Sequence, residues 1–161
     1  WEKSFKFEPD RFLSLFKDYC KYIKKAYLSD QNLGKQLNLT TEGINIGFRV
    51  IGDNSSDEYI INYGLSQVDI SRTQKPLEDN NRLTMTVSIP DFLIGMVMSG
   101  EVGFQEFVNN RFSIKRIGSY TKAENSFWIF LLPYFSTFLE LEGHISPENS
   151  SLDKLKERSV A

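Results

Sequence analysis

Apolar side chains occupy every second position in three stretches of this chain, and this alternation restricts the fold more than any other feature. The stretches are residues 44–50, 59–65 and 83–89. A period of two places successive side chains on opposite faces of a strand, so each stretch predicts a strand with one buried face. Turn-forming residues fill positions 52–56, so the first two strands are expected to form an antiparallel hairpin.

The remaining elements predict a mixture of helices and strands. Shorter strands are expected at residues 67–73 and 112–115, which brings the sheet to five strands. Residues 10–27 carry apolar side chains at three- and four-residue spacing, which predicts an amphipathic helix with one buried face. The predicted fold class is therefore α+β, with a five-stranded antiparallel sheet covered on one face by helices.

A second helix is expected directly after the strand at 83–89. Ser88 and Asp91 have the spacing of a capping box, and Pro90 is tolerated in a first helical turn. Gly100 follows the last apolar residue of this helix and suits the left-handed position just after a helix end.

The most apolar part of the chain is residues 126–142. A helix that spans a membrane needs about 20 apolar residues, and Pro133 interrupts this shorter run, so we do not expect a transmembrane segment. The run instead predicts a helix, broken or kinked at Pro133, that packs on the body of the protein. We expect one domain over residues 1–142 and a polar, partly flexible tail over residues 143–161.

Overall composition excludes several classes of partner. A chain of 161 residues fits one domain with a substantial core, and a formal net charge of −2 gives no general attraction to nucleic acid. The single cysteine excludes an internal disulfide and favours a reducing compartment, so the predicted location is cytoplasmic. The chain begins at Trp1 rather than Met, which favours a domain of a longer polypeptide.

No catalytic constellation is visible in the sequence. His144 is the only histidine and lies near the polar tail, and Cys20 falls on the apolar stripe of the first helix, where thiols are usually inert. The carboxylates are explained by turns, helix ends and solvated edges, and no phosphate-binding glycine loop is present. We therefore predict a protein that is not an enzyme and that needs no metal and no cofactor.

One block of motifs resembles a known family. Residues 83–93 run from a strand into a helix that begins Ser-Ile-Pro-Asp-Phe. Met98-Ser-Gly100 and an aromatic-bearing stretch from Phe104 to Gly118 follow. This order resembles the sterol carrier protein type 2 (SCP-2, sterol-binding) family, across about residues 10–142. The chain departs from the family pattern at Asn110, where a glycine is usual, and asparagine also tolerates the left-handed backbone.

The resemblance implies non-catalytic binding of an apolar, lipid-like ligand, fatty acyl or sterol-like, in a tunnel between sheet and helices. The candidate tunnel walls are Phe92, Met96, Phe104, Phe107, Val108, Phe112, Ile114, Trp128, Leu131, Leu132 and Phe135. The same residues would also serve as an ordinary core, and both interpretations stay open. Transient contact with a membrane is a further expectation. The alternative function is a structural, substrate-presenting or dimerisation domain of a larger enzyme, with a small hydrolase as a third possibility.

Overall fold

The computed structural model describes residues 6–104, 113–117 and 121–144 of the chain. Its centre is one five-stranded sheet with the strand order β3-β2-β1-β4-β5. The strands are β1 (Ile44–Ile51), β2 (Ser56–Tyr63), β3 (Val68–Arg72), β4 (Met85–Pro90) and β5 (Ser113–Arg116). The prediction of an α+β fold with five strands is confirmed.

The direction of one strand pair differs from the prediction. The pairs β1–β2, β2–β3 and β4–β5 are antiparallel, but β4 runs parallel to β1, with Ile46 opposite Met85 and Val50 opposite Ile89. The prediction of a purely antiparallel sheet is therefore wrong, because the sheet is mixed. A tight turn can join antiparallel neighbours only, and β1 and β4 are separated in the chain by two other strands.

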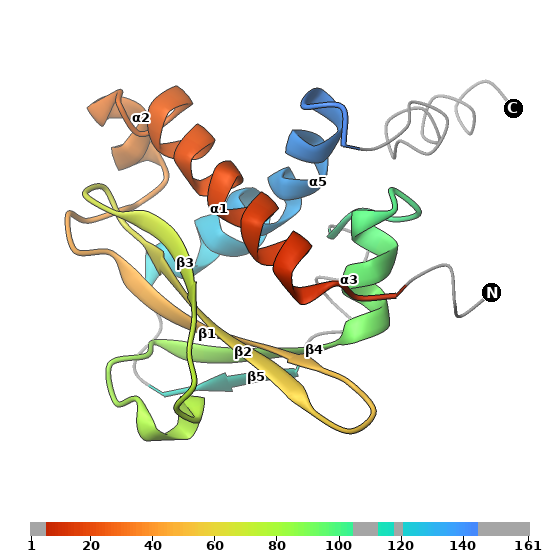
Figure 1. Cartoon of the computed structure of the whole chain (residues 1–161). Coiled ribbons are helices and arrows are strands. Elements are labelled where there is room, and N and C mark those ends of the chain that lie inside the picture. The colour runs from red at the N-terminus through yellow and green to blue at the C-terminus, as the bar shows by residue number, and fades with distance from the viewer. Residues whose placement is uncertain (1–5, 105–112, 118–120, 145–161) are drawn as a thin grey trace, which may run out of the picture.

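A long connection makes the parallel pair possible. Residues 73–84 leave β3 at one edge of the sheet, cross below it and return the chain to the start of β4, as the loop at the lower left of Figure 1 shows. The short 3-10 helix η2 (Leu77–Asp79) lies in this connection. The connection packs closely against Gly47 of β1, since a Cβ added at Gly47 would come 2.9 Å from Leu83 Cδ1 and 3.1 Å from Leu77 Cδ1.

The helices cover the opposite face of the sheet, which we call the inner face (Figure 1). They are α1 (Pro9–Ala26), α2 (Gln31–Gln36), α3 (Asp91–Met98), α4 (Lys122–Ser126), the π-helical segment η4 (Phe127–Leu131) and α5 (Leu132–Leu141). α1 confirms the predicted amphipathic helix, with its apolar residues buried and Lys17, Lys21, Lys24 and Lys25 exposed.

Two predicted helix ends have different outcomes. Ser88 remains in β4, opposite Arg49 and Ser113, and α3 begins after Pro90 without a side-chain capping bond, so the predicted capping box is wrong. Gly100 follows α3 with a φ of +82°, as its predicted place after the helix end requires. The helix is not broken at Pro133, since η4 runs directly into α5 and Pro133 lies in the first turn of α5; the irregularity is instead the π-helical turn that precedes it.

Candidate functional site

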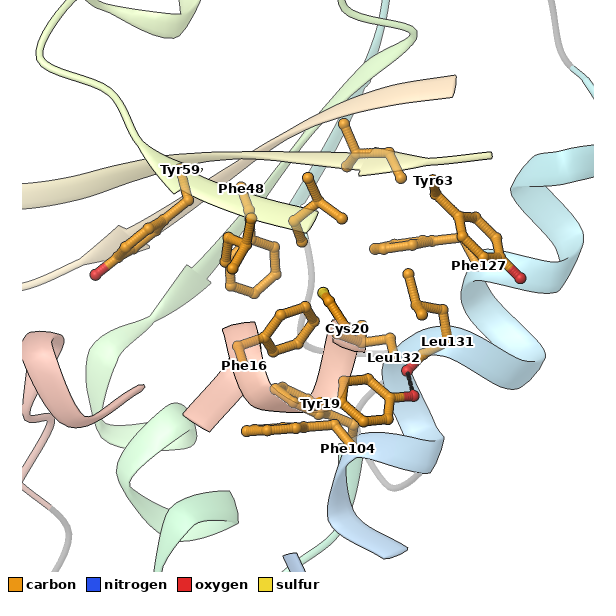
Figure 2. Close-up of a cluster of buried hydrophobic side chains, with 14 of the residues drawn as sticks. Phe16, Tyr19, Cys20, Phe48, Tyr59, Tyr63, Phe104, Phe127, Leu131 and Leu132 are labelled. Carbon is orange, nitrogen blue, oxygen red and sulfur yellow. Dashed lines mark hydrogen bonds between the residues drawn. The ribbon is translucent and has the colours of Figure 1, made fainter. Parts of the chain in front are cut away.

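The interior between the sheet and the helices is built mainly from aromatic rings. Phe12, Phe16 and Tyr19 project from successive turns of α1 and meet Phe135 of α5, with ring centroids 6.1, 4.9 and 5.3 Å apart. Phe48 of β1 joins them from the sheet, 6.2 Å from Phe12. Figure 2 shows Phe16, Tyr19 and Phe48 in this interior together with the neighbouring Leu131 and Leu132. Contacts at these distances are those of a packed core.

Four of the predicted wall residues meet in this interior. Phe104, Leu131, Leu132 and Phe135 all have no exposed surface. The ring of Phe104 lies 6.1 Å from that of Phe135, and the Phe104 backbone N–H donates to Ser136 Oγ at 3.2 Å. The structure places these four in the buried core, where Phe104 and Phe135 contact each other and the side chains pack against other protein side chains.

The other described wall residues lie at the margin of the helical layer. Ile114 of β5 is opposite Val87, so the two side chains lie on the same, inner face of the sheet. Val87 is fully buried, whereas Ile114 is 46% exposed, and Phe92 at the start of α3 is 53% exposed. Met96 and Trp128 are partly buried against the core. We call Phe92, Met96 and Ile114 the apolar margin. Phe107, Val108 and Phe112 lie outside the described residues.

Several buried polar groups were not predicted from the sequence. Tyr19 donates its hydroxyl to the Leu131 carbonyl, whereas the hydroxyl oxygens of Tyr59 and Tyr63 are buried and have no hydrogen-bond partner among the described residues. Burial raises the pKa of Tyr59 and of Tyr63 to about 12. Tyr59 and Tyr63 both occupy inward positions of the alternating stretch, so the sequence indicated that their side chains point to the core. The hydrogen-bond partner of a buried tyrosine hydroxyl cannot be predicted from one strand.

An ion pair between a buried carboxylate and a partly exposed guanidinium also escaped the sequence analysis. Glu124 of α4 is fully buried, and both of its carboxylate oxygens accept from the guanidinium of Arg116 on β5. A buried carboxylate requires such a partner, because an isolated charge in the interior costs several kcal/mol, of the order of 3–5 when one partner is removed. The pair therefore ties β5 to α4.

The chemistry available to these residues is limited. Burial, and secondarily the charge of Asp69, raises the pKa of the Cys20 thiol to about 12, which keeps it protonated and poorly nucleophilic at neutral pH. His144 is exposed, with its ring 6.3 Å from Phe138. Within residues 6–104, 113–117 and 121–144, no group of three His, Cys, Asp or Glu side chains could hold a metal ion. In the same ranges, no helix is both long enough and apolar enough to cross a bilayer.

Comparisons with known proteins give matches among solved structures. One is the apo form of sterol carrier protein 2 from Yarrowia lipolytica, at 14% identity and a TM-score of 0.44, covering 78% of this chain and 88% of that one. Another is the solution structure of the sterol carrier protein domain 2 of Helicoverpa armigera, at 17% identity and a TM-score of 0.39, covering 73% and 87%. Both bear the name of the family that the sequence resembles. No family model and no curated protein matches the chain.

Proposed function

We propose that this protein binds an apolar, lipid-like ligand without catalysing a reaction on it, and that the ligand enters at the apolar margin. The observation that carries the proposal is the difference between Val87 and Ile114, which share the inner face of the sheet but differ from full burial to 46% exposure. Ile114 is thus an apolar side chain on the inner face that stays nearly half exposed. Phe92, at the start of α3, is a second large apolar side chain that is about half exposed.

The arrangement of the interior favours entry from the side. Because Phe135 contacts both Phe16 and Phe104 at the centre, a ligand chain would have to lie along the margin or displace these rings. Of the eight predicted wall residues that the structure describes, four lie at the filled centre, three form the apolar margin, and Trp128 is partly buried against the core. The proposed site therefore uses Phe92, Met96 and Ile114 first, with the buried group as its inner wall.

The energy of such binding is sufficient without polar contacts. Sixteen buried methylenes contribute about 13 kcal/mol at roughly 0.8 kcal/mol each, before the ligand and side chains lose their freedom. Half of that burial at a partly open margin, about 6.5 kcal/mol, corresponds to a dissociation constant of roughly 20 μM before those losses and of about 1 mM or below after modest losses.

The test measures whether lipid-free protein takes up a fatty acid that carries a fluorescent group. We expect saturable binding at a stoichiometry of one, and native mass spectrometry of freshly purified protein should show a co-purified lipid. An Ile114→Asp variant should weaken uptake about tenfold, because a charge replaces an apolar contact. Ile129→Asp is the matched control, since Ile129 is 77% exposed and lies outside the proposed walls. No saturable uptake, or an equal loss in both variants, contradicts the proposal.

A second candidate function is that of a structural, substrate-presenting or dimerisation domain of a larger enzyme. The observation that favours it is the exposure of Ile129 and Leu141, at 77% and 63%, in the apolar segment 126–142. This function predicts self-association through η4 and α5, which analytical ultracentrifugation would detect and Ile129→Asp would abolish. A monomer over the whole concentration range contradicts the dimerisation form of this candidate.

Cellular location and membrane contact belong to the same proposal. The one cysteine, buried and protonated, favours a reducing compartment such as the cytoplasm. A ligand of this kind would be exchanged during brief contact with a membrane surface.

A further inference from the structure

A second pocket lies at the other end of β1 from α3. It is an open pocket of about 450 Å³ between the residues that precede β1 and the start of α4. Ile44, which lines it, is the first residue of β1, whereas α3 begins next to Pro90, the partner of Ile51 at the far end of that strand. The pocket is therefore separate from the apolar margin.

The floor of this pocket is apolar. Leu39, Ile44 and Ala123 line it, and all three are buried members of the hydrophobic core. A ligand in the pocket would thus cover core surface, which favours an apolar group at this depth.

The rim of the pocket carries two lysines from distant parts of the chain. Lys35 belongs to α2 and Lys122 to α4, and both line the pocket and are exposed. Neither forms a salt bridge with any residue in the described part of the chain. Glu42 does not line the pocket, and Glu124 of α4 is already paired with Arg116. The rim therefore presents two lysines that form no salt bridge within the described residues, and no carboxylate is among the residues that line the pocket.

An unsatisfied hydroxyl lies at the same place. Thr121 lines the pocket and precedes α4, but it makes no side-chain capping bond, and its Oγ1 is buried without a hydrogen-bond partner in the described ranges. Buried hydroxyls are usually hydrogen-bonded, so rotation about the side-chain bond toward an oxygen in the pocket would satisfy this group.

We propose that this pocket, which we call the lysine pocket, binds a small amphiphilic anion. The charged group, a carboxylate or phosphate, lies between Lys35 and Lys122, and a short apolar chain lies on Leu39, Ile44 and Ala123. Thr121 donates a hydrogen bond to an oxygen of the anion. This site is independent of the proposed function, because none of its residues belongs to the walls of the lipid site.

The experiment is a titration followed by amide chemical shifts, with hexanoate, hexyl phosphate and hexanol as probes. We expect saturable shifts at Leu39, Gly43 and Ala123 with a dissociation constant of about 1 mM or below for at least one of the anions. The anion with the lower dissociation constant shows whether the pocket prefers a carboxylate or a phosphate. Hexanol, which has the chain without the charge, should bind about tenfold more weakly or not at all.

Lysine variants separate the pocket from general surface charge. The double variant Lys35→Gln/Lys122→Gln should weaken binding of the anion about tenfold, and the matched control Lys17→Gln/Lys24→Gln on α1 should leave it unchanged. The inference is overturned if no anion gives saturable shifts, if hexanol binds as well as the anions, or if the control weakens binding equally. Shifts confined to Ile114 and its neighbours would also overturn it, while leaving the lipid site intact.

Discussion

The inner face of the sheet is fully buried beneath α1, which we call the sealed region, and is partly exposed at Ile114 of β5. Beneath α1, Phe48 of β1 and Tyr59 and Ile61 of β2 have no exposed surface, and rings from α1 fill the space above them. On β5, two strands away from β1, Ile114 points to the same face and remains nearly half exposed. The difference shows that apolar side chains on the same face are fully buried under α1 and partly exposed at β5, which is where we propose that the ligand binds.

The largest expected effect lies in the sealed region. Phe16→Ala removes a fully buried ring that contacts Tyr19 and Phe135, so the free energy of unfolding should fall by about 3–5 kcal/mol. Urea denaturation followed by circular dichroism measures this change. If the variant does not fold, Phe16→Leu should fold and lose less. A loss below about 1 kcal/mol for Phe16→Ala would mean that the interior is not tightly packed.

The pair that joins β5 to α4 should have the next largest effect. Arg116→Ala leaves the buried Glu124 carboxylate without its guanidinium and should cost about 2 kcal/mol or more of unfolding free energy. Replacing both residues, as Arg116→Met with Glu124→Leu, should recover much of the loss because no charge is then left buried. If the double variant is as unstable as Arg116→Ala, the loss does not come from an isolated charge.

Alkaline pH should lower the free energy of unfolding through two tyrosines of the sealed region. Burial raises the pKa of Tyr59 and of Tyr63 from 10.0 to about 12, so the unfolded chain releases these protons at lower pH than the folded protein does. The contribution of both groups is complete below about pH 10 and is lost as the pH rises toward 12. Urea midpoints at several pH values should therefore fall across this window.

A pair of conservative replacements isolates this effect. Tyr59→Phe with Tyr63→Phe removes both hydroxyls and should flatten the decline, with the remaining slope due to Cys20 and Tyr19, whose pKa values burial also raises. At neutral pH the same variant should be within about 1 kcal/mol of the parent, since neither hydroxyl has a partner to lose. An unchanged slope would show that other groups cause the alkaline loss.

The smallest effect on stability should come from the open margin. Ile114→Ala and Phe92→Ala remove side chains that are about half exposed, so each should change the unfolding free energy by less than about 1 kcal/mol. Their effect on uptake of the fluorescent fatty acid should be larger than their effect on stability. A strong loss of stability would mean that the margin belongs to the core.

The strands were predictable because period two is a local property of the sequence. Their directions were not, since the alternation in β4 is the same whether it runs parallel or antiparallel to β1. The helix α2 was missed because Gln31–Gln36 has one apolar side chain and an internal glycine, although Asp30 accepts a bond from the Asn32 N–H and is a readable cap.

The candidate site was only partly predictable for a related reason. The apolar residues of α3 itself occupy nearly every face of the helix. Their periodicity therefore could not predict that Leu93 is buried and Phe92 exposed. The burial of Leu131, Leu132 and Phe135 followed from their position in the most apolar segment. Whether such residues contact each other or a ligand depends on packing across the whole domain, which no local pattern records.

The connection formed by residues 73–84, which crosses the sheet beneath Gly47, leads us to expect two stages in the folding of this protein. β1, β2 and β3 are joined by short turns, and neighbouring strands of this kind close small loops with little loss of chain entropy. β4 must instead pair with the free edge of β1 after an excursion of more than thirty residues, from Ile51 to Met85. We therefore expect the first three strands to associate early, and the arrival of β4 on β1 to limit the rate at which the finished molecule forms.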